Sequence, residues 1–497
     1  NYLGGKYQAS SVGRVMTCVL GMVVRREREI RAFVKTPFYR VVSSIALEGE
    51  SFEGEWRAVE GSRYFQSPVL YKENGFKKKE DAQKLICELS TQQPLICTVE
   101  KIERKKENKN PPLLFNLAEL QNVCSKLFKI SPDETLSIVQ DLYEKKLVTY
   151  PRTDARVLST AVAKEIYKNI SGLRNYPQAG EAAQGALELG AYKNIAKTRY
   201  TNDKQITDHY AIIPTGQGLG ALKGLSLTAQ RVYETIVRRF LSIFYPPAVY
   251  QKVSLVTKME NESFFSSFKV LLSEGYLKIA ANSFAKKSMA EASGKTPESE
   301  GEGEVSCDEA LLAALQKLKK GDILNINGLG IKEGETSPPK RYNSGSMILA
   351  MENAGQLIED EDLRSQIKGS GIGTSATRAE ILKKLFNIRY LSLNKKTQVI
   401  TPTLQGEMIY DVVNCSIRQL LNPELTASWE KGLTYVAEGS ITEQEYMDKL
   451  EHFVRIRTKQ VEDSHFQYAL RQFFDAAAQF YKKPERETAM KKRQNTL

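Results

Sequence analysis

A tyrosine and an arginine that could act together on a phosphate lie on either side of a proline, in the segment LVTYPRTD at residues 147–154. Pro151 fixes its own φ near the extended range and disfavours the helical region for Tyr150. In an extended backbone, residues i and i+2 project to the same face, so the Tyr150 phenol and the Arg152 guanidinium can meet one phosphate. Because a phenol is poorly ionised at neutral pH, a nucleophilic tyrosine needs such a cation beside it. The segment therefore suits a nucleophile with its charge clamp, although on its own this pattern is more often typical of an ordinary strand end.

Three further segments carry residues that suit a phosphate-containing ligand. His209, in TDHYAIIPT, could donate a proton or a hydrogen bond to a phosphate, or it could be a hydrogen-bonded core residue. The stretch GIGTSATR, residues 371–378, places glycines and hydroxyl groups at an expected helix start, where free N–H groups attract phosphates; a plain capped turn is the alternative. In SSVGRVMT, residues 10–17, Gly13 permits close approach and Arg14 can pair with a phosphate, unless that arginine is simply solvated.

Composition favours an anionic partner. The 497 residues carry a formal charge of +12, and clusters of Lys and Arg that neutralise phosphates gain from counterion release. No apolar run approaches the length that a bilayer span needs, and residues 15–24 are read as a core helix that runs into a charged face. Six scattered cysteines without a Cys-x-x-Cys pair argue against a zinc ribbon or a disulfide framework and fit a reducing cytoplasm.

The order of patterned segments predicts two to four domains, one of them interrupted. Residues 37–59 and 249–279 alternate apolar and polar residues around short turns, which is typical of hairpins in one β domain split by an insertion. The insertion is expected to begin at a basic joint, residues 101–112, and to contain a helix capped by Ser131 with Pro132 at its first position. Tyr150 is expected on a short strand after that helix. Residues 369–410 have the helix, strand, turn, strand, helix order of a winged helix, with the first helix expected from about residue 376 and the basic turn 394–397 as its wing.

Taken together, these motifs resemble the type IA DNA topoisomerases, and most closely their bacterial topoisomerase III branch. Six motifs follow the order of that family between about residues 8 and 450: SSVGRVMT, LVTYPRTDARVLS, TDHYAIIPT, PPKRYNSGSMILAMENAG, GIGTSATRAEILKKLF and LTASWEKGL. The resemblance implies a multi-domain α+β fold: a toroidal core with winged-helix-like (CAP-like) domains and an interrupted, β-rich arch.

The expected domains follow from this resemblance and the segment pattern. A strand-binding domain would comprise residues 1–36 and 336–455, and the arch residues 37–100 and 246–335 with a flexible insertion at 282–306. A helical, winged-helix domain carrying the tyrosine would span residues 101–245, and a basic helical tail residues 456–497.

The resemblance also implies the chemistry. Tyr150 would attack a phosphodiester of single-stranded DNA and become joined to the 5′-phosphate, with Arg152 stabilising the phosphate and His209 assisting nearby. Resealing would need no ATP, because the bond energy is kept in the phosphotyrosine. The residues expected to bind DNA, some of which would also order the tyrosine loop, are Ser11, Val12, Gly13, Arg14, Val15, Met16, Thr153, Asp154, Arg341, Thr374, Thr377 and Arg378.

This sequence departs from the family pattern in several respects. Family members usually carry glutamine where this chain has Met16. The family's Toprim domain, whose acidic cluster holds Mg²⁺, has no counterpart here and is expected before residue 1, so the chain is read as a fragment that lacks the Mg²⁺ ligands; the family's C-terminal zinc modules are missing as well.

The expected partners are single-stranded DNA and negatively supercoiled or catenated duplex DNA, in the bacterial cytoplasm at the nucleoid. The chain is expected to act as a monomer away from membranes, with a RecQ-type helicase as a candidate partner. A non-catalytic single-strand-binding module is the alternative. A tyrosine recombinase is disfavoured, because that family places its tyrosine after its arginine and histidine signatures, whereas here Tyr150 precedes His209.

Overall fold

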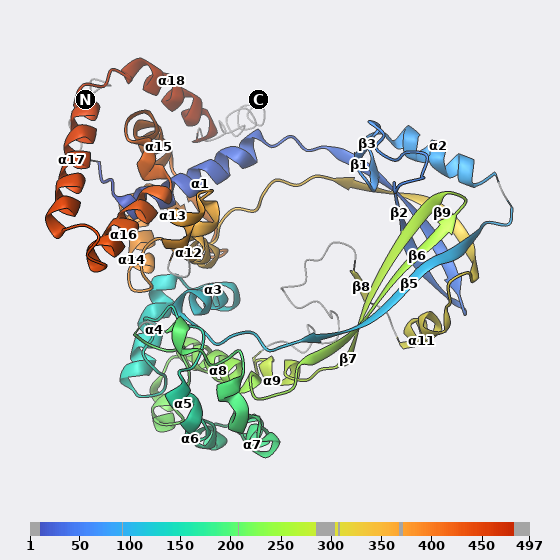
Figure 1. Ribbon diagram of the computed structural model, residues 1–497, viewed down its shortest axis with the longest axis horizontal. Coiled ribbons are helices and arrows are strands. Elements are labelled where there is room, and N and C mark those ends of the chain that lie inside the picture. The colour runs from blue at the N-terminus through green and yellow to red at the C-terminus, as the bar shows by residue number, and fades with distance from the viewer. Residues whose placement is uncertain are drawn as a thin grey trace, which may run out of the picture.

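Two helical lobes lie at one end of the molecule and a β-sheet domain at the other (Figure 1). The structure is a computed structural model and describes residues 10–91, 93–206, 208–284, 304–306, 309–366 and 371–481. We call residues 10–36 with 336–481 the terminal lobe, residues 113–247 the middle lobe and the intervening strands the sheet domain. Each of the three has a hydrophobic core of its own.

The sheet domain is built from both predicted β-rich stretches. Its elements are β1 (Pro37–Leu47), β2 (Glu50–Arg57), β3 (Leu70–Lys72), β4 (Gly75–Phe76), α2 (Lys79–Leu89), β5 (Ile96–Lys109), β6 (Ala248–Met259), β7 (Glu262–Ser273), β8 (Glu304–Ser306), α11 (Glu309–Lys317) and β9 (Ile323–Glu335). The short helix α9 (Leu277–Ala280) follows β7 and packs against the middle lobe. Pairing runs from β1 through β2, β7, β6, β5 and β9 back to β1, so these strands close on themselves like a barrel. The prediction of one β domain interrupted by an insertion is therefore confirmed.

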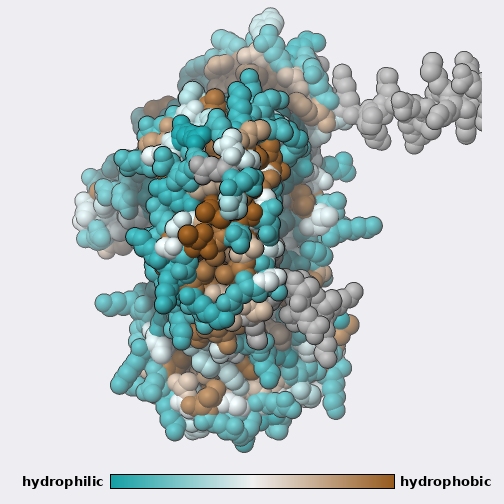
Figure 2. Space-filling model, turned by 90° about the vertical axis from the view of Figure 1, so that its right-hand side faces the viewer, coloured by the Kyte–Doolittle hydropathy of each residue, from teal (hydrophilic) through white to brown (hydrophobic). Residues whose placement is uncertain are grey.

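Turn chemistry sets the register of the first hairpin. Leu47 pairs with Glu50 across a two-residue loop in which Glu48 and Gly49 both have positive φ, as the tight turns that match strand twist require. Along β1, buried and part-exposed residues alternate from Val41 to Leu47, which is the burial that a period of two predicts. Figure 2 looks at this end of the molecule and shows hydrophilic residues over most of the face, with apolar residues gathered along its middle.

The prediction of a basic joint at residues 101–112 is wrong for residues 101–109. Residues 101–109 continue β5, where they pair antiparallel with β6 from Lys101 opposite Val256 to Lys109 opposite Ala248. A strand rich in charged residues resembles a linker in the sequence when the strand with which it pairs is far away along the chain. The sheet domain therefore extends past residue 100, where the first part of the arch was predicted to end. At the other end of the sheet domain, β8 pairs with β7 within the predicted insertion 282–306, while residues 285–303 lie outside the described residues.

The middle lobe consists of short helices around one core. They are α3 (Leu117–Phe128), α4 (Pro132–Glu144), α5 (Thr160–Glu165), α6 (Tyr167–Gly172), η1 (Leu173–Asn175), α7 (Gly180–Leu189), η2 (Ala191–Lys197), η3 (Asp203–Gln205), η4 (Leu219–Gly224) and α8 (Leu227–Ser242). The predicted cap of α4 is present, because the Ser131 hydroxyl accepts a hydrogen bond from the backbone N–H of Glu134 at 3.1 Å.

The terminal lobe is formed by the N-terminal and C-terminal parts of the described chain. It contains α1 (Arg14–Ala32), α12 (Ser344–Glu352), η5 (Ala354–Leu357), α13 (Glu361–Gln366), α14 (Arg378–Asn387), β10 (Leu391–Leu393), β11 (Ile400–Pro402), α15 (Leu404–Ser416), η6 (Arg418–Leu421), α16 (Glu424–Ala437), α17 (Glu443–Glu462), α18 (Gln467–Ala478) and η7 (Gln479–Tyr481). The predicted winged-helix order holds from α14 through the β10–β11 hairpin to α15. The predicted start of the tail at residue 456 falls inside α17, and residues 482–497 lie outside the described part of the chain.

None of the described helices combines the length and apolar character that crossing a membrane would require.

Candidate active site around Tyr150

A short backbone pairing positions the segment that leads to Tyr150. The Thr149 N–H donates to the Ile213 carbonyl and the Thr215 N–H to the Leu147 carbonyl, each at 3.0 Å, and Val148 forms an isolated bridge with Pro214. The predicted strand is thus reduced to a single bridge that ends before Tyr150. Beyond it the chain turns tightly, because the Thr153 N–H donates to the Pro151 carbonyl at 3.0 Å.

Burial alternates through the tyrosine loop, residues 150–154. Pro151 and Thr153 are buried, whereas Tyr150 and Asp154 are half-buried and Arg152 is exposed. This alternation turns the phenol and the guanidinium away from the core, as the spacing around the proline suggested. Among the described residues, the Arg152 side chain has no hydrogen-bond or ion-pair partner, which leaves its charge available to an anion from outside.

The structure brings His209 to Tyr150 from a distant part of the sequence. The two ring centroids are 4.3 Å apart, and Tyr143 of α4 meets the Tyr150 ring edge-on at 5.5 Å. Two threonines hold the segments together: the Thr149 hydroxyl donates to the Ala211 carbonyl at 3.0 Å, and the Thr153 hydroxyl to the His209 carbonyl at 2.8 Å. Thr153, predicted to bind DNA, therefore uses its buried hydroxyl to fix the loop that carries His209.

Asp154 and Arg378, both predicted to bind DNA, contact each other instead. The Arg378 Nη1 donates to the Asp154 Oδ1 at 2.9 Å, and the arginine side chain is only 1% exposed. Arg378 therefore has no free surface for a direct DNA contact in this state. The position of Arg378 at a helix start suggested a phosphate site. The sequence alone cannot show that the residue faces a neighbouring lobe.

The segment 11–16 leads into the first turn of α1. Gly13 is extended there, and a Cβ at this position would meet no atom within 4 Å, so neither backbone strain nor packing requires a glycine. Arg14 pairs with Glu430 of α16 at 3.0 Å, with both side chains 39% exposed. Such an exposed pair is worth roughly 0–1 kcal/mol and can exchange readily for a phosphate. Ser11, whose N–H donates to the Tyr390 hydroxyl, and Val15 are half-buried, and Val12 is exposed.

Met16 lies in the core of the terminal lobe. Its side chain therefore offers no surface to a strand, which accounts for an apolar residue at this position.

The predicted glycine and hydroxyl motif forms a turn before α14. Gly371 and Gly373 both have positive φ, and the Thr374 N–H donates to the Thr377 hydroxyl at 3.0 Å. The helix begins at Arg378, two residues later than predicted, and Thr377 makes no side-chain cap. Thr374 and Thr377 are exposed, so their hydroxyls face solvent beside the buried Arg378.

Arg341, the remaining predicted DNA contact, is held by a carboxylate. Its Nε and Nη2 donate to the two oxygens of Glu27 at 2.7 and 2.9 Å. These bonds are the main reason that the pKa of Glu27 is lowered. Arg341 thus ties the strand that leaves the sheet domain to α1, and it remains 43% exposed.

Acidification is expected to remove the stabilising effect of the Glu27–Arg341 pair. Because the pKa of Glu27 is lowered in the folded chain, ionised Glu27 stabilises the fold at neutral pH, and this contribution disappears as the pH falls from 4.5 through the lowered pKa. Glu27→Gln should cost about 1 kcal/mol at pH 7 and lose less further stability than the parent between about pH 5 and pH 3. Calorimetry across this range provides the measurement, and parallel pH profiles would contradict the prediction.

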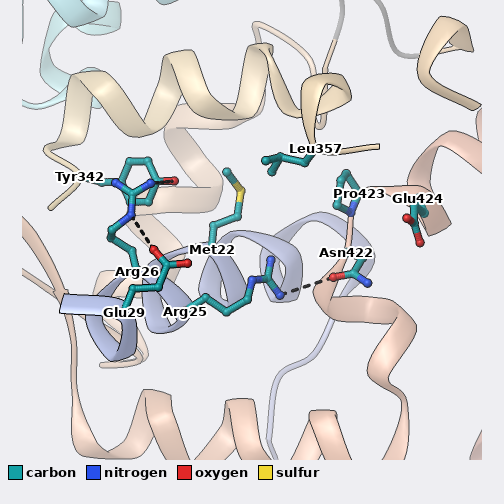
Figure 3. A pocket seen from close by; sticks show the side chains of 9 residues that line it. All are labelled: Met22, Arg25, Arg26, Glu29, Tyr342, Leu357, Asn422, Pro423 and Glu424. Carbon is teal, nitrogen blue, oxygen red and sulfur yellow. Dashed lines mark hydrogen bonds and ion pairs between the residues drawn. The ribbon is translucent and has the colours of Figure 1, made fainter. Parts of the chain in front are cut away.

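A polar pocket of about 300 Å³ lies between α1, the start of α12 and the start of α16 (Figure 3). Arg26 stacks on the Tyr342 ring at 4.4 Å and donates to the Lys340 carbonyl, while Arg25 donates to Asn422 and to the Leu421 carbonyl. These bonds keep both guanidinium groups in fixed positions. Glu29 and Glu424 also line the pocket, so its charge is mixed and it does not by itself identify an anion site.

The described residues do not fit a metal centre. They contain no group of three or more His, Cys, Asp or Glu side chains that could hold an ion. Near Tyr150 the carboxylate of Asp154 is already paired with Arg378. We therefore derive no step of the chemistry through a metal.

Comparisons with known proteins show the family to which this chain belongs. A family model described as DNA topoisomerase matches residues 3–448. DNA topoisomerase 3 of Bacillus licheniformis and that of Bacillus subtilis are each 31% identical over 458 residues, covering 91% of this chain and 57% of the relative. DNA topoisomerase 3 of Bacillus cereus is 28% identical over 464 residues, covering 92% of this chain and 57% of the relative. The chain thus spans about 57% of the length of the curated relatives that it matches.

A solved structure shows the same fold. Full-length topoisomerase I from Thermotoga maritima superposes with a TM-score of 0.60 at 22% identity, covering 92% of this chain and 64% of that one. Because the family model matches most of the sequence, the chain belongs to the DNA topoisomerase family, in its type IA class and with bacterial topoisomerase 3 proteins among its relatives.

Proposed function

We propose that this chain carries the nucleophilic half of a type IA topoisomerase site, in which Tyr150 cuts one DNA strand and later reseals it. The phenol oxygen attacks a backbone phosphorus, the bond from phosphorus to the 3′-oxygen breaks, and the departing oxygen takes a proton to become a 3′-hydroxyl. The phenol proton leaves to a base or to water. The strand end is then held as a 5′-phosphotyrosine, and the reverse attack reseals it without ATP. Relaxation of negative supercoils or decatenation would follow when another strand passes through the break.

The observation that carries this proposal is the loop around Tyr150, in a chain that belongs to the topoisomerase family. The phenol lies beside the imidazole of His209, and the loop presents an Arg152 side chain that no described residue neutralises. An exposed guanidinium next to a tyrosine suits a phosphate, because its planar fork can donate two hydrogen bonds to phosphate oxygens. His209 is placed to donate a hydrogen bond to the same phosphate or to its leaving oxygen.

The terminal lobe is proposed to hold the strand. Segment 11–16 leaves open space at Gly13 and contains Arg14, whose ion pair is weak. The exposed hydroxyls of Thr374 and Thr377 are proposed as further contacts to the strand. Arg341 is proposed to contribute its exposed edge while it remains bound to Glu27. The closed sheet domain would act as the arch of a toroid that admits the passing strand (Figure 1).

The source of the chain, its DNA substrates, its metal ion and its partners are proposed from the relatives and the family resemblance. The Bacillus relatives support a bacterial source, and hence action on supercoiled or catenated DNA at the nucleoid. Mg²⁺ for this chemistry is proposed to be bound by residues other than those described. Action as a monomer and a RecQ-type helicase partner stay predictions of the family resemblance.

Covalent trapping tests the proposed function and its polarity. The purified chain is incubated with Mg²⁺ and a single-stranded oligonucleotide labelled at either end, and then denatured. We expect the 3′-label, and not the 5′-label, to remain with the protein on a peptide that contains Tyr150. Binding without any adduct would favour the alternative, a non-catalytic single-strand-binding module. Retention of the 5′-label would indicate a 3′-phosphotyrosine, which is recombinase chemistry.

Arg152→Ala is expected to slow adduct formation about 100-fold to 1,000-fold, the usual cost of removing one donor to a developing charge. Single-strand affinity should change less than threefold, because the terminal lobe carries most of the proposed strand contacts. Arg152→Lys should recover only part of the rate, since an ammonium group lacks the planar fork. Adduct time courses and fluorescence anisotropy provide the two measurements.

Arg199→Ala is the matched control for Arg152→Ala, since Arg199 is also exposed and belongs to the same lobe. An equal loss of rate in both variants would show that only the overall charge of the middle lobe matters.

A further inference from the structure

The chain path leaves the contact between the two lobes non-covalent. The terminal lobe joins the sheet domain through β1 and β9, and the middle lobe joins it through β5 and β6 (Figure 1). The tyrosine lies in the middle lobe, whereas the proposed strand contacts lie in the terminal lobe. How the tyrosine loop is held against the terminal lobe therefore decides where the phenol meets a bound strand.

Asn116 makes the first link between the tyrosine loop and the terminal lobe. It caps α3 by accepting from the Glu119 N–H, and it is 1% exposed. Its Nδ2 donates both to the Asp154 carbonyl at 3.1 Å and to the Glu352 Oε1 at 2.6 Å. One amide group thus connects the last residue of the tyrosine loop to the last residue of α12.

The ion pair between Arg378 and Asp154 makes the second link. Arg378 is buried at the start of α14, and its Nη1 reaches the Asp154 carboxylate at 2.9 Å. Burial raises the pKa of Glu352, while the nearby Arg378 and the bond from Asn116 act in the opposite direction. Separating the lobes would remove Asp154 from a buried guanidinium, which is far more costly than breaking an exposed pair.

Both links end close to Tyr150. The Leu117 N–H donates to the Thr153 carbonyl at 3.1 Å, next to the Asn116 cap. Thr153 in turn donates to the His209 carbonyl, so the same bonds fix the imidazole that lies against the phenol. A displacement of Asp154 would therefore reach Arg152 and Tyr150 within four residues of the chain, and His209 through the hydrogen bond of the adjacent Thr153.

Apolar packing also joins the lobes, because Ala118 of α3 belongs to the core of the terminal lobe. Two further polar contacts between the lobes lie away from the loop. Ser125, Ser344 and Gln398 form a buried chain of hydrogen bonds, but Ser125 lies nine residues along α3 from Asn116, about 13 Å away. The Lys383–Asp133 pair spans 3.1 Å between side chains that are 49% and 36% exposed, so it contributes little.

We propose that the Asn116–Glu352 and Asp154–Arg378 contacts form a two-point latch that fixes the tyrosine loop to the terminal lobe, with Glu352 and Arg378 as positioning residues for Tyr150. This inference rests on the proposed function of Tyr150. It assigns Arg378 to loop positioning in place of the DNA contact that its sequence motif suggests. The latch releases when the lobes separate, and its two links are coupled because Asn116 also donates to the Asp154 carbonyl.

Hydrogen–deuterium exchange on the chain without DNA tests the latch independently of any cleavage. In Glu352→Ala and Arg378→Ala, amides in residues 147–156 and 115–119 should exchange at least about tenfold faster than in the parent. Glu352→Gln should restore the parent pattern, because its amide oxygen can still accept from Asn116. Lys383→Ala is the matched control: it removes a contact between the lobes from the same helix, α14, and should leave both segments unchanged.

A second measurement connects the latch to the chemistry. Arg378→Ala should lower adduct formation at saturating oligonucleotide about tenfold while single-strand affinity changes less than threefold, which is the pattern of a misplaced nucleophile. The proposal is overturned if exchange in residues 147–156 stays within twofold of the parent. It is also overturned if α8 accelerates equally, or if Lys383→Ala has the same effect. Failure of the covalent assay in the parent, with the exchange result intact, would count against the proposed function and not against the latch.

Discussion

Tyr150→Phe is expected to abolish the covalent adduct with single-stranded DNA while leaving strand affinity and thermal stability close to those of the parent. The substitution removes only the hydroxyl, for which no described residue provides a hydrogen-bond partner, and it retains the ring that contacts His209 and Tyr143. Without the phenol oxygen no atom remains to take the phosphate, so the expected loss is complete rather than partial. Denaturing gels with a 3′-labelled oligonucleotide measure the adduct, and anisotropy measures the affinity.

Tyr143→Phe is the matched control, because Tyr143 is also a tyrosine, is more exposed and touches the same ring. It should retain the adduct. An undiminished adduct in Tyr150→Phe would rule out Tyr150 as the nucleophile, and loss of the adduct in Tyr143→Phe alone would transfer that role to its neighbour.

Local sequence signals predicted the elements that short-range physics determines. The Ser131 cap, the turn at Glu48 and Gly49 and the helix–hairpin–helix order from α14 to α15 all follow from backbone preferences within a few residues. The pairing of two β stretches across a long insertion was also predictable, since each stretch on its own leaves a hydrophobic face uncovered. These signals are local, so they need no knowledge of which lobes meet.

Residues at the contact between lobes were not predictable in this way. Asp154 and Arg378 lie in different motifs, and each looks like a phosphate contact until the fold places them 2.9 Å apart. Asn116 carried no signal beyond a helix cap, and Glu352 lies in the motif PPKRYNSGSMILAMENAG, where nothing in the sequence distinguished it from its neighbours. The charged part of β5 was taken for a joint because its partner β6 is remote in sequence. A polar residue is predicted to be solvated or to bind a ligand when the element that buries it or pairs with it is not known.

Gly371→Ala is expected to destabilise the terminal lobe by about 3 kcal/mol or more and thereby to disrupt the turn that presents Thr374 and Thr377. Gly371 has a φ of +67°, and a Cβ there would lie 2.2 Å from the Met351 carbonyl oxygen and 2.3 Å from that of Glu352. Backbone atoms cannot rotate away as a side chain can, so α12 or the turn must move. Because Glu352 ends α12, such a movement would also disturb the proposed latch.

Substitutions at two other glycines of the same lobe separate the cost of the positive φ from the cost of the clash. Gly439 has a φ of +73° in open space, so Gly439→Ala should cost only the left-handed penalty of about 1–2 kcal/mol. Gly13 has neither a positive φ nor a described neighbour, but it is the N-cap of α1, where alanine is less favourable than glycine, so Gly13→Ala should cost at most about 1 kcal/mol. Denaturant unfolding of the three variants should rank them in this order, and equal losses at Gly371 and Gly439 would show that the clash with α12 is relieved at no cost.

Gly13→Ala then becomes the informative variant for function. Among the described residues nothing lies close to the position that a Cβ of residue 13 would take, so this space is open to a bound strand. We expect Gly13→Ala to weaken single-strand binding by the folded chain about tenfold, because an added methyl would hold a strand away from the first turn of α1 and from Arg14. Anisotropy at two salt concentrations measures this effect. Unchanged affinity would place the strand elsewhere on the terminal lobe.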